Sequence, residues 1–158
     1  MYTTVALADT YISTHYTADS SERRRWEELT EDDKKVYLTN SFEAIEKLQF
    51  KGRKAVSGQE TAFPRLPYQY GKTDEIAPQR VKFAEIELAL WLSDTKRTAK
   101  SKKRKELIED GVKSFSVGDL SENYGDTAQT EVRTVSALKC SKCRELLLPY
   151  LCGGFETC

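Results

Sequence analysis

The sequence predicts a mainly α protein: a small helical bundle with a long inter-helix loop, a β-hairpin or extended arm (about residues 112–124) and a C-terminal helix. Apolar residues recur at helical spacing in several segments, while one segment alternates with a period of two. Gly and Pro gather between the helical segments. We divide the chain into a helical core domain at residues 1–110, the arm at 111–133 and a C-terminal helix and tail at 134–158.

Residues 5–16 are expected to form a short helix, because Ala8 and Ile12 fall on one face and Thr3 or Thr4 precedes as a cap. The polar residues that follow this segment are expected to form a loop, at positions 18–25.

The clearest helix spans residues 31–49. Thr30 can cap it, and three acidic residues follow in the first turn, where the helix dipole favours negative charge. Leu38 and Ile45 belong to its apolar stripe.

Residues 50–77 contain several Gly and Pro residues and no sustained period, so we expect a long ordered loop or two short extended pieces. Phe50 and Phe63 are expected to pack against the core. Gly52 is expected to serve the C-terminus of the preceding helix with a positive φ. The spacing around Gly52 does not match the phosphate-binding loop GxxxxGK[ST], which excludes a nucleotide cradle of that kind.

Pro78 suits the first turn of a helix, where its missing N–H has no cost. The following residues, VKFAEIELALWL, are apolar on nearly all sides, with Lys82, Glu85 and Glu87 as exceptions. Such a helix is expected at the centre of the bundle.

The last third of the chain changes character. Residues 96–105 hold seven cations and form either a solvated helix end or a disordered loop. Residues 112–124 alternate, which predicts the hairpin or arm, and residues 134–150 predict a last helix that Pro149 would kink or end.

Twenty-five basic and twenty-five acidic residues give a formal net charge of zero. Proteins that depend on phosphate contacts usually carry a basic surplus, so the overall charge does not indicate nucleic-acid binding. Neither a secretory signal nor an apolar run long enough to span a membrane is recognisable, and we expect a cytosolic protein without a membrane partner.

All four cysteines lie in the last nineteen positions, and reduced thiols are the simpler interpretation. A zinc site is the weak alternative, with the ligands Cys140, Cys143, Cys152 and Cys158. We expect no metal and no cofactor. The single histidine, His15, is expected to have a packing or surface role, and no catalytic constellation accompanies it, so no enzyme is predicted.

Clustered cations are candidates for contact with DNA or with a neighbouring subunit. They are Lys51, Arg53, Lys54, Arg65, Lys96, Arg97, Lys100, Lys102, Lys103, Arg104 and Lys105. The run at 96–105 lacks the interleaved aromatics that single-strand binders use to stack bases, so a solvated loop is its alternative interpretation.

Several sequence blocks follow one another along nearly the whole chain: ADTYIxxH, DDKKxYLTNSFEAIEKLQFKGRKAVSGQETAFPR, IAPQRVKFAEIELAL, VKSFSVGDLSENYGD and LLLPYL. In this order they resemble a family of head–tail connector (adaptor) proteins from tailed bacteriophages and prophages. Some of its members are also described as DnaT-like single-stranded DNA-binding proteins. The lysine-rich run and the cysteine-bearing C-terminus have no match in the family pattern.

The resemblance implies a structural protein of the virion neck, present in the host cytoplasm during assembly. Copies would form a ring under the portal, commonly of twelve, that extends the DNA channel. The implied partners are the portal protein, neighbouring copies, a downstream neck or tail-completion protein and packaged DNA. We expect contacts with the portal or with neighbours from Phe115, Val117, Leu120, Tyr124, Leu147, Tyr150 and Leu151.

The alternative function is that of a single-stranded DNA-binding replication accessory protein. The cations at 51–54 and 96–105 would then contact phosphates, and the affinity for DNA would fall steeply with salt.

Overall fold

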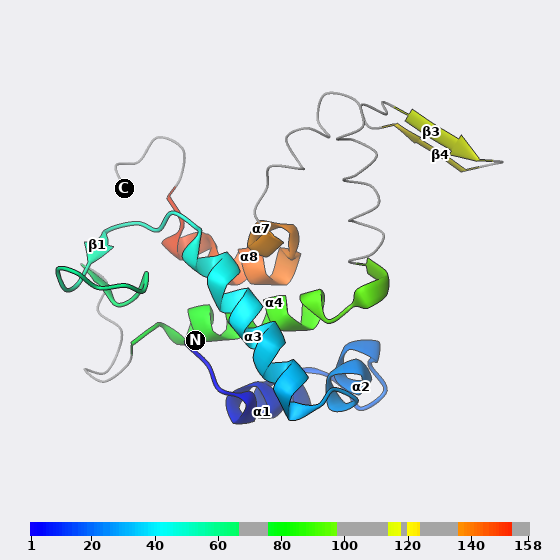
Figure 1. Ribbon diagram of the computed structural model, residues 1–158, viewed down its shortest axis with the longest axis horizontal. Helices are drawn as coiled ribbons and strands as arrows, with labels where there is room; N and C mark the ends of the chain where they lie inside the picture. Colours follow the sequence, from blue (N-terminus) through cyan, green and yellow to red (C-terminus); the bar gives the residue numbers. More distant parts are fainter. Residues whose placement is uncertain (67–75, 98–113, 118–119, 124–135, 153–158) are drawn as a thin grey trace. The chain divides into compact units, whose positions relative to one another are not determined.

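The computed structural model describes residues 1–66, 76–97, 114–117, 120–123 and 136–152. The chain divides into two compact units, one formed by Met1–Ser93 with Val135–Cys158 and the other by Asp94–Thr134. The predicted fold class is confirmed, because the described elements are mainly helices accompanied by two small two-stranded sheets (Figure 1).

Helix α1 spans Val5–His15 and helix α3 spans Glu31–Glu46, within a few residues of the predicted bounds. The side chains of Thr4 and Thr30 cap them by accepting a hydrogen bond from an amide of the first turn. Both caps are readable from sequence because a threonine directly precedes each periodic segment.

Helix α2, Ser21–Glu27, occupies most of the segment predicted as a loop, so that prediction is wrong. The Ser20 hydroxyl accepts a hydrogen bond from the Arg23 amide at 3.2 Å. The Arg23 Nε atom pairs with the Glu27 carboxylate one turn later, at 2.7 Å. A cap and an i,i+4 ion pair therefore support a short helix whose polar composition hides it.

The predicted long loop contains a small antiparallel pair of strands, β1 (Arg53–Lys54) and β2 (Arg65–Leu66). Gly52 has a φ of 74°, the positive value expected for it. Helix α3 has its C-cap at Lys47, however, so Gly52 does not end the helix as predicted but turns the chain into β1.

Helix α4, Gln79–Leu92, lies between two groups of buried residues. Figure 1 shows α1 and α2 on one side of α4 and α7 and α8 on the other. On the α1–α2 side it contributes Ile86, Ala89 and Leu90, and on the other side Val81, Ala84 and Leu88. Because α4 packs on two sides, nearly all of its surface is apolar. The central position that the sequence predicted for this helix is thus confirmed.

Phe50 and Phe63 are buried in the second of these groups, which confirms their predicted place against the core. Their rings meet edge to face, with centroids 4.9 Å apart.

The predicted C-terminal helix is divided into α7 (Ser136–Lys139), α8 (Ser141–Leu147) and the 3-10 helix η1 (Leu148–Tyr150). Cys140 has an extended backbone, with φ −79° and ψ 107°, and separates α7 from α8. A single uninterrupted helix was therefore the wrong prediction for this segment.

The end of η1 is joined to the chain that follows α3. The Lys51 amide donates to the Tyr150 carbonyl at 2.8 Å, and the Cys152 amide donates to the Gln49 carbonyl at 3.1 Å. These bonds place the C-terminal segment directly beside the start of the β1–β2 hairpin.

In the other unit, β3 (Ser114–Val117) pairs antiparallel with β4 (Leu120–Asn123). The hairpin predicted at 112–124 is thus confirmed for the residues that the structure describes. Among the described helices, none has the length and apolarity that crossing a membrane requires.

Arg65 organises the β1–β2 hairpin from within. Its guanidinium donates to the carbonyls of Phe50 at 2.8 Å, Lys51 at 2.8 Å and Ala62 at 3.3 Å, and also to that of Gly52. Only arginine presents enough donors in a plane to reach all four acceptors. The side chain therefore works as an internal brace.

Tyr2 and Glu46 connect the N-terminal segment to α3 and to the hairpin. The Tyr2 hydroxyl donates to Glu46 and accepts from the Phe63 amide at 3.1 Å. Glu46 also accepts from the Ala62 amide at 2.8 Å. A carboxylate of α4 completes this arrangement, because Glu85 Oε2 accepts from the Tyr2 amide at 2.9 Å.

We predict that Arg65→Lys lowers the free energy of unfolding by about 2–3 kcal/mol, because a lysine leaves several of these carbonyls without a donor. Arg53→Lys, in the strand paired with β2, is the matched control and should change it by no more than about 0.5 kcal/mol, because Arg53 is exposed. Urea denaturation followed by circular dichroism gives both values. Equal losses in the two variants would contradict the role assigned to Arg65.

We also predict a pH dependence that originates at Glu85. This side chain is fully buried, and burial raises its pKa from 4.5 to about 7, although the amides of Tyr2 and Thr3 and the N-terminal ammonium oppose the shift. The folded state therefore binds a proton that the unfolded state releases, and this contribution to stability is lost as the pH rises from about 4.5 to about 7.

Glu85→Gln should remove this dependence, which amounts to at most about 3 kcal/mol. Urea denaturation at about pH 5 and about pH 8 measures it, with Glu43→Gln on the exposed face of α3 as the control. If the glutamine variant kept the full loss of stability between the two pH values, the assignment to Glu85 would be wrong.

Candidate nucleic-acid interface

The cations predicted in the β1–β2 hairpin have different roles in the structure. Lys54 Nζ donates to the carbonyls of Gln59 at 2.8 Å and Glu60 at 3.1 Å, so its ammonium closes the loop between the strands. Arg65 is the internal brace described above. Lys51 is half-buried, and Arg53 is exposed in β1.

Of the cations in the lysine-rich run at residues 96–105, the structure describes the first two. Lys96 and Arg97 are exposed, and Arg97 Nε lies 3.4 Å from a carboxylate oxygen of Asp94. The remaining cations of this run lie outside the described residues: Lys100, Lys102, Lys103, Arg104 and Lys105.

The residues expected to contact a portal or a neighbouring copy lie in different environments. Leu147 is fully buried in the core, and Tyr150 and Leu151 pack against the same group of residues. Leu147 therefore serves the interior. Phe115, Val117 and Leu120 belong to β3 and β4, and Tyr124 lies outside the described residues.

The cysteines do not gather into a described metal site. Cys140 and Cys143 are buried thiols, and burial raises the pKa of the Cys143 thiol far above its ordinary value. Cys152 is disulfide-bonded, so the prediction of reduced thiols is wrong for this residue, and Cys158 lies outside the described part. Among the described residues, no group of three or more His, Cys, Asp or Glu side chains could hold a metal ion.

A group that the sequence did not indicate surrounds the buried Glu87 of α4. The Tyr11 hydroxyl donates to Glu87 Oε1 at 2.7 Å, and the Tyr16 hydroxyl donates to Oε2 at 2.6 Å. Lys142 Nζ donates in turn to the Tyr16 oxygen at 2.8 Å and lies 4.3 Å from the centroid of its ring. His15 is exposed and stacks on Tyr11 with centroids 4.0 Å apart, in agreement with the packing or surface role predicted for it.

Glu87 fixes the position of the Tyr16 ring. Burial and the neighbouring Glu87 carboxylate raise the pKa of Tyr16 far above its ordinary value, so its phenol stays protonated and continues to donate. The ring itself is only partly buried, and Lys142 is exposed. An aromatic ring held by a hydrogen bond thus lies beside an exposed surface cation.

Helices α7 and α8 supply further exposed cations, Lys139 and Arg144. We call Tyr16, Lys139, Lys142 and Arg144 the α8 basic group. One sign of this group was visible in the sequence, which is Glu87 in a largely apolar helix. A buried carboxylate needs hydrogen-bond donors, and in such a helix they must come from another part of the chain.

Although the formal net charge is zero, acidic and basic residues are distributed unevenly along the chain. Residues 1–35 contain eight acidic and five basic side chains. Residues 47–66 contain five basic and one acidic, and residues 136–152 contain three basic and one acidic. The two basic segments are the ones joined by the hydrogen bonds between Lys51 and Tyr150 and between Gln49 and Cys152.

Comparison with known proteins gives one family. Its model, described as "Putative DnaT-like ssDNA binding protein", matches residues 2–158. Neither a curated protein nor a solved structure matches the chain. The family model agrees with the description of some similar proteins as DnaT-like single-stranded DNA-binding proteins. The comparisons give no support to the head–tail connector, so that function stays a prediction. The chain belongs to the family of DnaT-like ssDNA-binding proteins.

Proposed function

We propose that this protein binds single-stranded DNA without catalysing a reaction on it. The family assignment supports the proposal, and so does the partition of charge that leaves two adjoining basic segments. The observation that carries it is the Tyr16–Lys142 pair, a held aromatic ring next to an exposed ammonium group.

Proteins that bind single strands combine aromatic rings, on which bases stack, with cations that follow the phosphates. Every base has an aromatic face, so this mode of binding depends little on the base sequence of the strand. In the proposed complex, Lys142 leaves the Tyr16 ring and pairs with a phosphate, while a base stacks on the ring face that the lysine has vacated. Glu87 would keep the ring oriented, because its hydrogen bond is to the phenol hydroxyl and leaves the ring faces free to stack.

The same strand would continue along the α8 basic group towards the β1–β2 hairpin. Lys139 and Arg144 provide the next phosphate contacts, and Arg53 provides another in the hairpin. Arg53, one of the cations predicted to contact DNA or a neighbouring subunit, would thus bind a phosphate. Arg65 would instead stabilise the hairpin in which Arg53 lies.

The proposal predicts that replacing the Tyr16 ring weakens binding of a fluorescein-labelled oligothymidine, measured by anisotropy. Tyr16→Leu should bind about 5- to 150-fold less tightly than Tyr16→Phe, because one base–aromatic stack contributes about 1–3 kcal/mol. Both variants lose the hydrogen bond to Glu87, so their difference isolates the ring.

Lys142→Gln should weaken binding and reduce the slope of log K against log [salt] by roughly 0.7, the value for one phosphate contact on a single strand. Lys35→Gln, an exposed lysine of the acidic segment, is the control and should leave affinity and slope unchanged. Failure of the wild-type protein to bind at low salt would refute the function. Wild-type binding that none of the variants alters would refute only this location for it.

The head–tail connector is the second candidate, and one observation favours it. Strands β3 and β4 lie in a compact unit of their own, as an arm that pairs with a neighbouring copy would. Incubation of the protein with portal-containing heads, followed by electron microscopy, tests this candidate. A ring of copies at the portal, together with no affinity for oligothymidine, would favour the connector over the DNA-binding protein.

A further inference from the structure

Beside Tyr16 lies a second aromatic ring that the same carboxylate holds. Glu87 Oε2 accepts from the Tyr16 hydroxyl at 2.6 Å, and Oε1 accepts from the Tyr11 hydroxyl at 2.7 Å. Both phenols therefore point at one carboxylate, and the two rings are close neighbours in space. Tyr11 itself is buried, so it offers no surface to a ligand.

His15 extends this second ring system to the surface. Its imidazole stacks on the Tyr11 ring, with centroids 4.0 Å apart and an angle of 21° between the ring planes. Tyr11 thus covers one face of the imidazole. Because His15 is nevertheless exposed, solvent reaches the opposite face. The chain therefore presents two accessible aromatic surfaces close to Glu87, which are the partly buried Tyr16 ring and the outer face of His15.

The imidazole has a defined orientation. Its Nδ1 atom lies 2.9 Å from the Tyr11 carbonyl, and since a carbonyl oxygen only accepts, Nδ1 donates this hydrogen bond. The Phe83 ring lies beside both side chains, with its centroid 4.6 Å from that of Tyr11 and 5.9 Å from that of His15. A stack, a hydrogen bond and a neighbouring ring together hold the imidazole.

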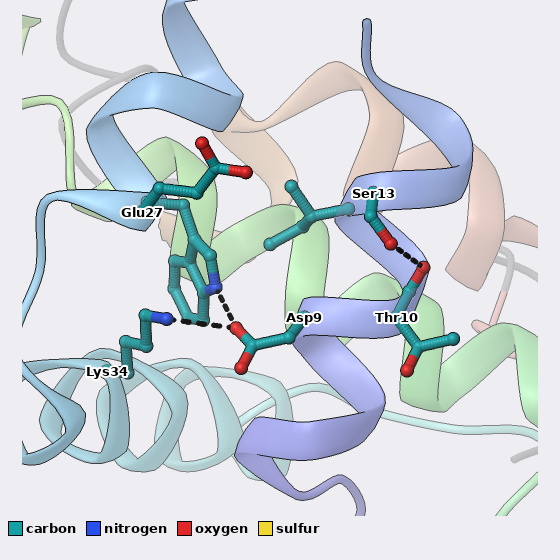
Figure 2. A pocket seen from close by; sticks show the side chains of 7 residues that line it. Asp9, Thr10, Ser13, Glu27 and Lys34 are labelled. Atoms are coloured by element: carbon teal, nitrogen blue, oxygen red, sulfur yellow. Dashed lines mark hydrogen bonds and ion pairs between the residues drawn. The ribbon is translucent and has the colours of Figure 1, made fainter. Parts of the chain in front are cut away.

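Helix α1, which carries His15, is itself anchored to three other helices. Figure 2 shows Asp9 in the middle of α1, where its Oδ1 accepts from Trp26 Nε1 of α2 at 2.7 Å and from Lys34 Nζ of α3 at 3.0 Å. The third anchor is the phenol hydrogen bond from α1 to Glu87 of α4. The imidazole is thus preorganised, which lowers the entropic cost of placing a ligand on it.

This arrangement suits consecutive bases of an unpaired strand. Bases of single-stranded nucleic acid stack on aromatic side chains, histidine among them. In a duplex each base is already paired and stacked, so it covers a protein ring only after it has left the helix. Two neighbouring ring faces therefore favour a strand with two successive free bases over a duplex.

We propose that His15 is a second base-stacking residue and that the site takes two consecutive bases of a single strand, one on Tyr16 and the next on His15. The inference rests on the proposed function, since both bases belong to the same strand. Tyr11 and Glu87 touch neither base and act as positioning residues, because they set the separation of the two rings.

The first test compares two variants by the anisotropy of a fluorescein-labelled oligothymidine. His15→Leu should bind about 5- to 150-fold less tightly than His15→Phe, the contribution of one base–aromatic stack. Both variants lose the hydrogen bond from Nδ1 to the Tyr11 carbonyl, so their difference isolates the ring. Thr14→Ala, at the exposed neighbouring position of α1, is the control and should leave the affinity unchanged.

The second test changes the strand and leaves the protein intact. An oligothymidine of the same length in which every second nucleotide is abasic keeps all phosphates but never offers two consecutive bases. The wild-type protein should bind it about 5- to 150-fold less tightly than the complete strand. His15→Leu should bind the two strands within about twofold of each other, because only Tyr16 still takes a base and the two losses are not additive.

The outcomes separate this inference from the function on which it rests. Equal affinities of His15→Phe and His15→Leu would overturn the second stacking residue, and so would an abasic penalty that is the same in the wild type and in His15→Leu. With either result, a weakened Tyr16→Leu would leave the binding of single strands standing. Failure of the wild-type protein to bind any strand would refute the function and this inference together.

Discussion

The structure depends on the burial of two carboxylates in its central helix. Glu85 and Glu87 lie in α4 among side chains that are otherwise apolar, and a buried carboxylate is costly unless donors surround it. The donors come from the first sixteen residues: the Tyr2 amide for Glu85, and the hydroxyls of Tyr11 and Tyr16 for Glu87. Polar bonds to α4 therefore position the N-terminal segment and α1, in addition to the apolar contacts of Ala8 and Ile12.

The functional proposals follow from that constraint. The hydrogen bond that satisfies Glu87 also orients the Tyr16 ring, and the oriented ring lies against Lys142 of α8. A requirement of the core thus produces a fixed aromatic group at the surface. In the middle of α1, Asp9 accepts hydrogen bonds from Trp26 and Lys34 and so joins α1 to α2 and α3.

Local patterns predicted the regular elements well. Thr30 and the period of α3, the apolar surface of α4 and the alternation around β3 and β4 each indicated the element that forms. Helix α2 was missed because its support is a serine cap and an ion pair rather than an apolar period. The site was missed for a different reason: Tyr16 and Glu87 are 71 positions apart, and Lys142 and Tyr16 are 126 apart. Likewise, Arg65 looked like a surface cation because the carbonyls that it braces carry no signature in sequence.

In the proposed complex, a base of single-stranded DNA stacks on Tyr16. Photochemical crosslinking of the full chain to oligothymidine, followed by mass spectrometry of the digested complex, tests it most directly. A crosslinked peptide that contains Tyr16 is expected, and this crosslink should be lost when excess unlabelled oligothymidine competes. A bound strand that crosslinks to other peptides but never to the one carrying Tyr16 would contradict the claim.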